Sequence, residues 1–147
     1  MVGWLTACGS APPVVDPPPC ASSGATMFQI DRRSDEPQRN PISTLTLHEG
    51  GAWSYREIVA GVARQRSGCL DRTSLDRVIG AVVAPWIAIG MASVCDAFSP
   101  NYTEYRARGA LVRTERVCDT TALDDRSAKA LATIVEILEP LTRNESK

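Results

Sequence analysis

The chain is poor in the residue types from which common catalytic and metal sites are built. It has one histidine, His48, and no Cys-x-x-Cys pair, so the ligand spacing of a zinc site is absent. It also has no Gly-x-Ser-x-Gly motif, no phosphate-binding loop and no dinucleotide-binding glycine pattern. We therefore expect no catalytic residue, no metal and no cofactor. A histidine-based hydrolase would depend on His48 alone, which we interpret as an exposed turn residue ahead of Gly50-Gly51.

Neither sign of charge dominates the composition. Sixteen basic and seventeen acidic residues leave a formal net charge of −1, which provides no overall field to attract nucleic acid or anionic lipid. We therefore expect no nucleic-acid partner. Most of the basic residues are arginines spread over several segments, and we interpret them as solvated strand faces rather than as a binding patch. They occupy positions 32, 33, 56, 64, 66, 106, 108, 113 and 116.

Long apolar runs are also scarce. Residues 78–95 contain no charged residue and reach the length of about 18 that a spanning helix needs. Pro85 near the middle of this run and several small residues argue against such a helix. We predict instead a buried helix that ends at Pro85, followed by a core strand from about Trp86 to Val94.

Leu5-Thr6-Ala7-Cys8, followed by Gly9 and Ser10, resembles the lipobox of bacterial lipoproteins. In that family the cysteine is diacylated and the peptide before it is removed. The resemblance therefore implies that Cys8 carries a lipid and that residues 1–8 are the remnant of a signal peptide and lipobox. Only four residues precede the box, so we expect the native start of translation upstream of Met1. Without such a segment, Cys8 is an ordinary thiol at the terminus.

A proline-rich segment, residues 9–26, separates this terminus from a single domain at residues 27–143. Such a segment cannot build a core and favours extended conformations, which suits a tether between a membrane anchor and a domain. An unstructured tail would have the same composition.

Four cysteines remain if Cys8 is lipidated: Cys20, Cys69, Cys95 and Cys118. An even number in an exported domain predicts two disulfides, for which three connectivities exist. We favour Cys95 with Cys118, because both lie beside strands of the second half, and therefore Cys20 with Cys69. Scattered structural thiols in a cytosolic protein are the alternative.

Two helices are predicted from apolar residues that recur every three or four positions. The first begins near Thr73 or Ser74, and the second follows Asp124-Asp125 and ends at Pro140. We read Asp124-Asp125 as residues of a helix start rather than as paired catalytic carboxylates. The apolar stripes of the two helices are Leu75, Val78, Ile79, Val82 and Val83 in the first and Leu131, Ile134, Val135 and Leu138 in the second. We expect all of these residues except Val83 to form the buried seam.

Short alternating segments between turn residues predict antiparallel strands. They are Met27 to Ile30 as an edge strand, Ser43 to Leu47, Ala52 to Tyr55, and a hairpin with arms at Tyr102–Arg108 and Leu111–Cys118. The polar stretch Asp31 to Pro41 is expected to be a loop.

The two halves of the chain resemble each other. Tyr55-Arg56 matches Tyr105-Arg106 at an offset of 50, Cys69 matches Cys118 at 49, and Leu75-Asp76 matches Leu123-Asp124 at 48. This suggests a duplicated strand–strand–helix unit, although chance similarity is the alternative. We predict an α+β fold: an antiparallel sheet with two helices on one face and a wet opposite face available to a partner.

Aromatic residues are few, and four of them are candidates for an interaction surface: Trp53, Tyr55, Tyr102 and Tyr105. The same residues would equally suit a core. We expect an exported, non-catalytic binding module of the bacterial cell envelope, periplasmic or at the surface. It would contact the membrane through a lipid on Cys8 and bind an unknown protein partner. The alternatives are a proteinaceous inhibitor of a secreted hydrolase and an enzyme with a carboxylate-based site.

Overall fold

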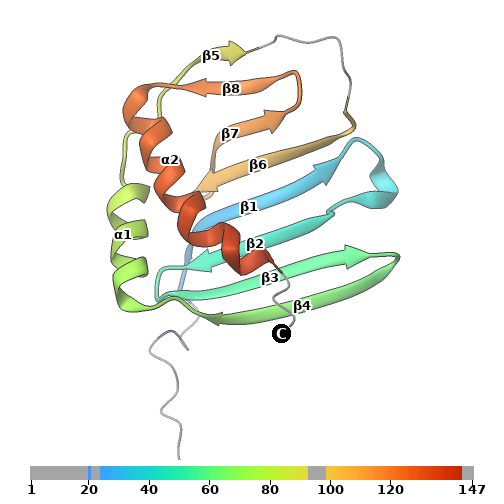
Figure 1. Cartoon of the computed structure of the whole chain (residues 1–147), viewed down its shortest axis with the longest axis horizontal. Coiled ribbons are helices and arrows are strands. Elements are labelled where there is room, and N and C mark those ends of the chain that lie inside the picture. Colours follow the sequence, from blue (N-terminus) through green and yellow to red (C-terminus); the bar gives the residue numbers. More distant parts are fainter. Residues whose placement is uncertain (1–19, 21–23, 93–98, 144–147) are drawn as a thin grey trace, which may run out of the picture.

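The computed structural model describes residues 20, 24–92 and 99–143 and has the predicted α+β fold (Figure 1). Eight strands form one antiparallel sheet in the order β4-β3-β2-β1-β6-β7-β8-β5. Two helices, α1 and α2, lie side by side on one face of it, in front of the sheet in Figure 1. The first-half strands are β1 (Thr26–Ser34), β2 (Ser43–His48), β3 (Ala52–Val59) and β4 (Val62–Cys69). The second-half strands are β5 (Ala88–Ala92), β6 (Asn101–Ala107), β7 (Ala110–Arg116) and β8 (Thr120–Leu123).

The predicted edge strand is the centre of the sheet. β1 pairs with β2 on one side and with β6 on the other, so the prediction of an edge position was wrong. The predicted loop at Asp31 to Pro41 is wrong over its first residues, because β1 continues through Asp31 to Ser34. Only the remainder leaves the sheet, in the short helix η2 (Pro37–Arg39).

The predicted core strand from Trp86 to Val94 corresponds to β5, which is neither central nor buried. β5 lies at the outer edge beside β8, and all five of its residues are exposed. The prediction failed because aliphatic content alone does not distinguish a core strand from an exposed edge strand. Trp86, just before β5, does pack against the core, where its ring lies 6.5 Å from that of Phe28. No helix among the described residues is long and apolar enough to cross a membrane.

Both predicted helices form close to their expected positions. α1 spans Arg72–Val82 and α2 spans Asp125–Leu138, followed by the short helix η3 (Glu139–Thr142) at Pro140. The side chains of Asp71 and Asp124 cap them by accepting hydrogen bonds from the backbone N–H groups of Ser74 and Ser127, each at 2.8 Å. An aspartate at this position satisfies one of the free N–H groups of a helix start.

The core lies between the helices and the sheet. Most predicted seam residues are in it, but Ile79 of α1 is 37% exposed, so the predicted seam was too wide there. α1 lies at the margin of the sheet and buries only one narrow side. The fully buried set includes Phe28, Leu45, Leu47, Val78, Ile134 and Leu138.

The two halves share a topology but not the predicted landmarks. In each half a meander of three strands leads into a helix, β2-β3-β4-α1 and β6-β7-β8-α2. However, Tyr55 lies on the second strand of its meander and Tyr105 on the first. Leu75 lies within α1, whereas Leu123 ends β8 before α2 begins. The helix caps, Asp71 and Asp124, are the positions that correspond.

Candidate functional site: an arginine-lined cleft under α2

The four aromatic residues predicted as an interaction surface do not lie together. Tyr55 is 4% exposed in the core, and Trp53 and Tyr105 pack against the same core from the face under the helices. Tyr102 lies on the opposite face, because it is an odd number of residues from Tyr105 on the same strand. There the guanidinium of Arg116 lies 4.5 Å from the centre of its ring.

Cys20 and Cys69 form a disulfide, as predicted, with their Cα atoms 5.7 Å apart. The bond joins the end of the proline-rich segment to the end of β4. Cys118 is also disulfide-bonded. Its predicted partner Cys95 lies outside the described residues, as does Cys8, so the pairing of Cys95 with Cys118 and the lipidation of Cys8 stay predictions.

His48 has a structural contact at the end of β2. Its Nδ1 lies 2.9 Å from the carbonyl oxygen of Gly24, and since a carbonyl can only accept, this nitrogen carries the proton. Within the described part of the chain, no three His, Cys, Asp or Glu side chains gather as a metal site would require.

The open face of the sheet carries charges that neutralise one another. Asp31 of β1 is 4% exposed; its carboxylate accepts a hydrogen bond from Gln29 at 2.8 Å and one from Arg106 at 3.3 Å. Arg106 also pairs with Glu104 at 3.4 Å, and Glu104 pairs with Arg33 at 3.6 Å. These groups satisfy each other across β1 and β6, so they leave little capacity for a ligand.

The helix-covered face contains a cleft between α2 and the three strands β1, β6 and β7. It has a volume of about 460 Å³, within the range of small-molecule sites. One wall is the apolar side of α2 and the other is a mixed polar and apolar strip of the sheet. We call it the arginine cleft; it is lined by Ile30, Arg32, Thr103, Tyr105, Arg113 and Glu115 from the sheet and by Ala128, Leu131, Ala132, Val135, Glu139 and Thr142 from α2 and η3.

A β-bulge places the charged part of this strip under the helix. At the turn end of the hairpin Arg106 pairs with Leu111, but the next pair is Tyr105 with Arg113, so β7 has one extra residue. A shift by one residue moves every following side chain to the other face. Arg113 and Glu115 therefore lie beside Tyr105 on the helix side instead of on the open face.

The C-terminal turn is held over the sheet by an arginine from β4. The guanidinium of Arg66 donates to the carbonyl oxygens of Arg143 at 2.7 Å and Leu141 at 3.1 Å. These bonds fasten η3 to the first half of the chain. The end of α2 is thereby fixed above the sheet.

The two arginines of the cleft differ in how far they are neutralised. Arg113 lies 3.5 Å from Glu115, and its buried Nε has no hydrogen-bond partner. Arg32 of β1 has no carboxylate within 4 Å in the described part of the chain. The remaining acidic group, Glu139, pairs with Arg143 at 3.7 Å. Arg32 is therefore the cation of the cleft that has no ion-pair partner among the described residues.

Tyr105 supplies a neutral hydroxyl to the cleft. Burial, and next the negative charge of Glu115, raise the pKa of Tyr105 to about 12. The phenol therefore keeps its proton at neutral pH, and the neighbouring carboxylate of Glu115 is the group that can accept it.

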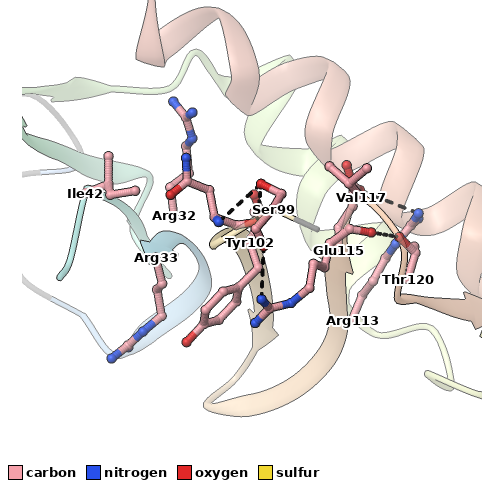
Figure 2. A pocket seen from close by; sticks show the side chains of 12 residues that line it. Arg32, Arg33, Ile42, Ser99, Tyr102, Arg113, Glu115, Val117 and Thr120 are labelled. Carbon is pink, nitrogen blue, oxygen red and sulfur yellow. Dashed lines mark hydrogen bonds and ion pairs between the residues drawn. The ribbon is translucent and has the colours of Figure 1, made fainter. Parts of the chain in front are cut away.

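A second cavity, of about 490 Å³, adjoins the cleft and shares Arg32, Thr103, Arg113 and Glu115 with it. Figure 2 shows this cavity, with arginines from β1 and β7 on its sides. Two of its cations are engaged elsewhere: Arg33 pairs with Glu104, and Arg116 binds Asp35 at 2.6 Å. The Arg116 hydrogen bond lowers the pKa of the Asp35 carboxyl below its usual value.

Sequence reasoning missed this gathering of arginines. Arg32 and Arg113 belong to strands far apart in the chain, and they come together through the pairing of β1 with β6 and of β6 with β7. The interpretation of the arginines as solvated strand faces does not describe Arg113, whose side chain is partly buried, whereas Arg32 lines the cavity but is exposed, as that interpretation expects. No local motif marks them, and the bulge that turns Arg113 has no glycine to signal it.

A third cavity, of about 800 Å³, lies between the two helices and is lined mainly by alanine, valine and proline with a rim of Arg77, Arg126 and Lys129. It has no convergent buried polar groups, so the arginine cleft is the better candidate for a specific site. Comparisons of the chain with protein-family models, curated proteins and solved structures found no match.

Proposed function

We propose that this chain is an exported, lipid-anchored binding module of the bacterial cell envelope that holds a small ligand in the arginine cleft without catalysing a reaction. The cleft is the observation on which the proposal rests. It combines the apolar side of α2 with a sheet wall that carries a few polar groups, which is the usual composition of a small-molecule site.

The proposal of export rests on the lipobox resemblance and on the cysteines. The disulfide between Cys20 and Cys69 is of the kind that persists in oxidising compartments and is rare in a bacterial cytosol. It also ties the tether to the sheet at the end of β4.

Fractionation of cells that produce the native full-length protein tests the anchor. We expect the protein in the membrane fraction and Cys8→Ser in the soluble fraction, because acyl chains contribute about 0.8 kcal/mol per buried methylene. Ser10→Ala, two residues further along, is the matched control and should stay with the membrane. Mass spectrometry that finds an unmodified Cys8 in the native protein would contradict the anchor.

A variant that fills the cleft tests the binding site. Ala132 lines the cleft, whereas Ala130 on the same helix faces the groove between the helices. We expect that at least one of three probes with an octyl chain, 1-octanol, octanoate or octyltrimethylammonium, binds the wild type in calorimetry, that Ala132→Trp abolishes this binding, and that Ala130→Trp preserves it. If no probe binds, or if both variants bind equally, the cleft is not a ligand site.

A further inference from the structure

The cations of the arginine cleft, Arg32 and Arg113, lie on its sheet wall. Arg32 faces the helix side of β1, since it pairs with Ser43 and Thr103, and Arg113 reaches the same side through the bulge. In the sheet, Arg32 lies level with Thr103 and Glu115, and Arg113 lies level with Tyr105 and Ile30. The helix wall opposite them is aliphatic at Leu131 and Val135. A bound molecule would therefore meet cations on the sheet wall and aliphatic side chains on the helix wall.

The number of charges limits the ligand further. The lining carries two arginines and two glutamates, but Glu115 pairs with Arg113 and Glu139 with Arg143 outside the cleft, which leaves Arg32 without an ion-pair partner. One negative charge on the ligand would balance it. A cationic ligand would place like charge beside Arg32, and a dianion would exceed the available partner.

The following inference rests on the proposed function. We infer that the arginine cleft takes an amphipathic monoanion, with an acidic head group at Arg32 and Arg113 and an aliphatic body against α2. A guanidinium presents a planar set of donors that matches a carboxylate or phosphate head. The small side chains Ala128 and Ala132 leave room for the body.

The test compares head groups at constant chain length in calorimetric titrations of the full chain. Octanoate should bind more tightly than 1-octanol, and octyltrimethylammonium and acetate should bind weakest, because the first repels Arg32 and the second has no aliphatic body. The affinity for octanoate should also fall as salt concentration rises. Octyl sulfate, a monoanion with a tetrahedral head, is compared with octanoate to distinguish a tetrahedral from a planar head group at equal charge.

Substitution of one arginine inside the cleft and one outside it tests where the anionic head group binds. Arg32→Ala should weaken octanoate binding by about tenfold to 100-fold, the range for hydrogen bonds to a charged group, and should leave octanol binding unchanged. Arg64→Ala, an exposed arginine of β4 outside the cleft, is the matched control and should bind octanoate like the wild type. Denaturant unfolding of each variant confirms that it is folded.

The outcomes separate this inference from the proposed function. If octanol or the ammonium probe binds as well as octanoate, or if Arg32→Ala binds octanoate normally, the cleft binds ligands but the anionic class is wrong. If no octyl probe binds the wild type, the proposed function fails together with the inference.

Discussion

The two halves of the chain start their helices with the same four-residue pattern and use it differently. Asp71-x-x-Ser74 begins α1 and Asp124-x-x-Ser127 begins α2, and in both the aspartate accepts from the backbone N–H of the serine. The hydroxyl of Ser74 returns to Asp71 at 2.8 Å, in solvent. The cap of α1 is therefore a local device whose contacts end within one turn of helix.

Ser127, in contrast, forms hydrogen bonds outside its own helix. It is completely buried, donates to the carbonyl of Pro85 at 2.8 Å and accepts from the N–H of Ile87 at 2.9 Å. Both partners belong to the segment that leaves α1 and enters β5. The same serine that completes a cap in one half thus joins the two halves in the other.

The helices themselves show the same contrast. α1 buries Leu75, Val78 and Val82 and exposes Ile79, whereas α2 crosses the sheet, buries residues over its whole length and forms the wall of the arginine cleft. The duplicated topology therefore provides one helix for the margin of the core and one for its centre and its cavity.

The strongest test of this comparison replaces the two serines by alanine. Ser127→Ala should lower the free energy of unfolding by about 1–3 kcal/mol, because two buried backbone groups lose their hydrogen-bond partner. Ser74→Ala should change it by no more than about 0.5 kcal/mol, since water replaces the lost contact. Urea unfolding followed by tryptophan fluorescence measures both.

Equal losses in the two variants would show that the serines act only as local caps. Ser127→Thr serves as a second variant, since it keeps the hydroxyl; a loss as large as that of Ser127→Ala would mean that packing, rather than hydrogen bonding, matters at this site.

The helices could be predicted because their signals are local. A stripe of aliphatic residues, an aspartate before it and a proline after it lie within about fifteen residues of one another, and the structure places both helices accordingly. The cap at Asp124 was visible for the same reason. The burial of Ser127 was not, because it depends on Pro85 and Ile87, which lie about forty residues earlier.

β4, one of the two strands that were not predicted (the other is β8), and the misplaced β1 lack such local signals. β4 reads VARQRSGC, with polar residues on both of its faces, because it is an edge strand. β1 was truncated at Asp31, since a carboxylate in a strand centre looks like a turn residue. It is stable there because Arg106, 75 residues later, lies beside it on β6.

The candidate site could not be predicted from the sequence for a related reason. Trp53 and Tyr55 do lie on the same face of β3, as the alternation of side chains along a strand requires. That alternation does not indicate which face of the sheet the helices cover. Nor does it reveal a bulge. The position of Arg113 under α2 depends on one additional residue in β7, and only the observed pairing of β6 with β7 reveals it.

The smallest predicted effect concerns the aspartates of the two caps. The backbone N–H and then the hydroxyl of Ser74 lower the pKa of Asp71, and the side chain and backbone N–H of Ser127 lower that of Asp124. The hydroxyl of Ser127 has only one proton, however, and the Pro85 carbonyl accepts it at 2.8 Å. We therefore infer that Asp124 accepts a hydrogen bond from the backbone N–H of Ser127 only, whereas Asp71 accepts from both the backbone N–H and the hydroxyl of Ser74.

A carboxyl group whose pKa is lower in the folded state stabilises the fold above its ordinary pKa, near 4, and this contribution is lost as pH falls through the lowered value. Asparagine caps a helix without titrating. Asp71→Asn should therefore reduce the loss of stability between pH 6 and pH 2, and Asp124→Asn should reduce it less, as measured by urea midpoints at each pH. If Asp124→Asn has the larger effect, the Ser127 hydroxyl serves its own cap after all, and the contrast between the two halves is weaker than the contacts at Pro85 and Ile87 indicate.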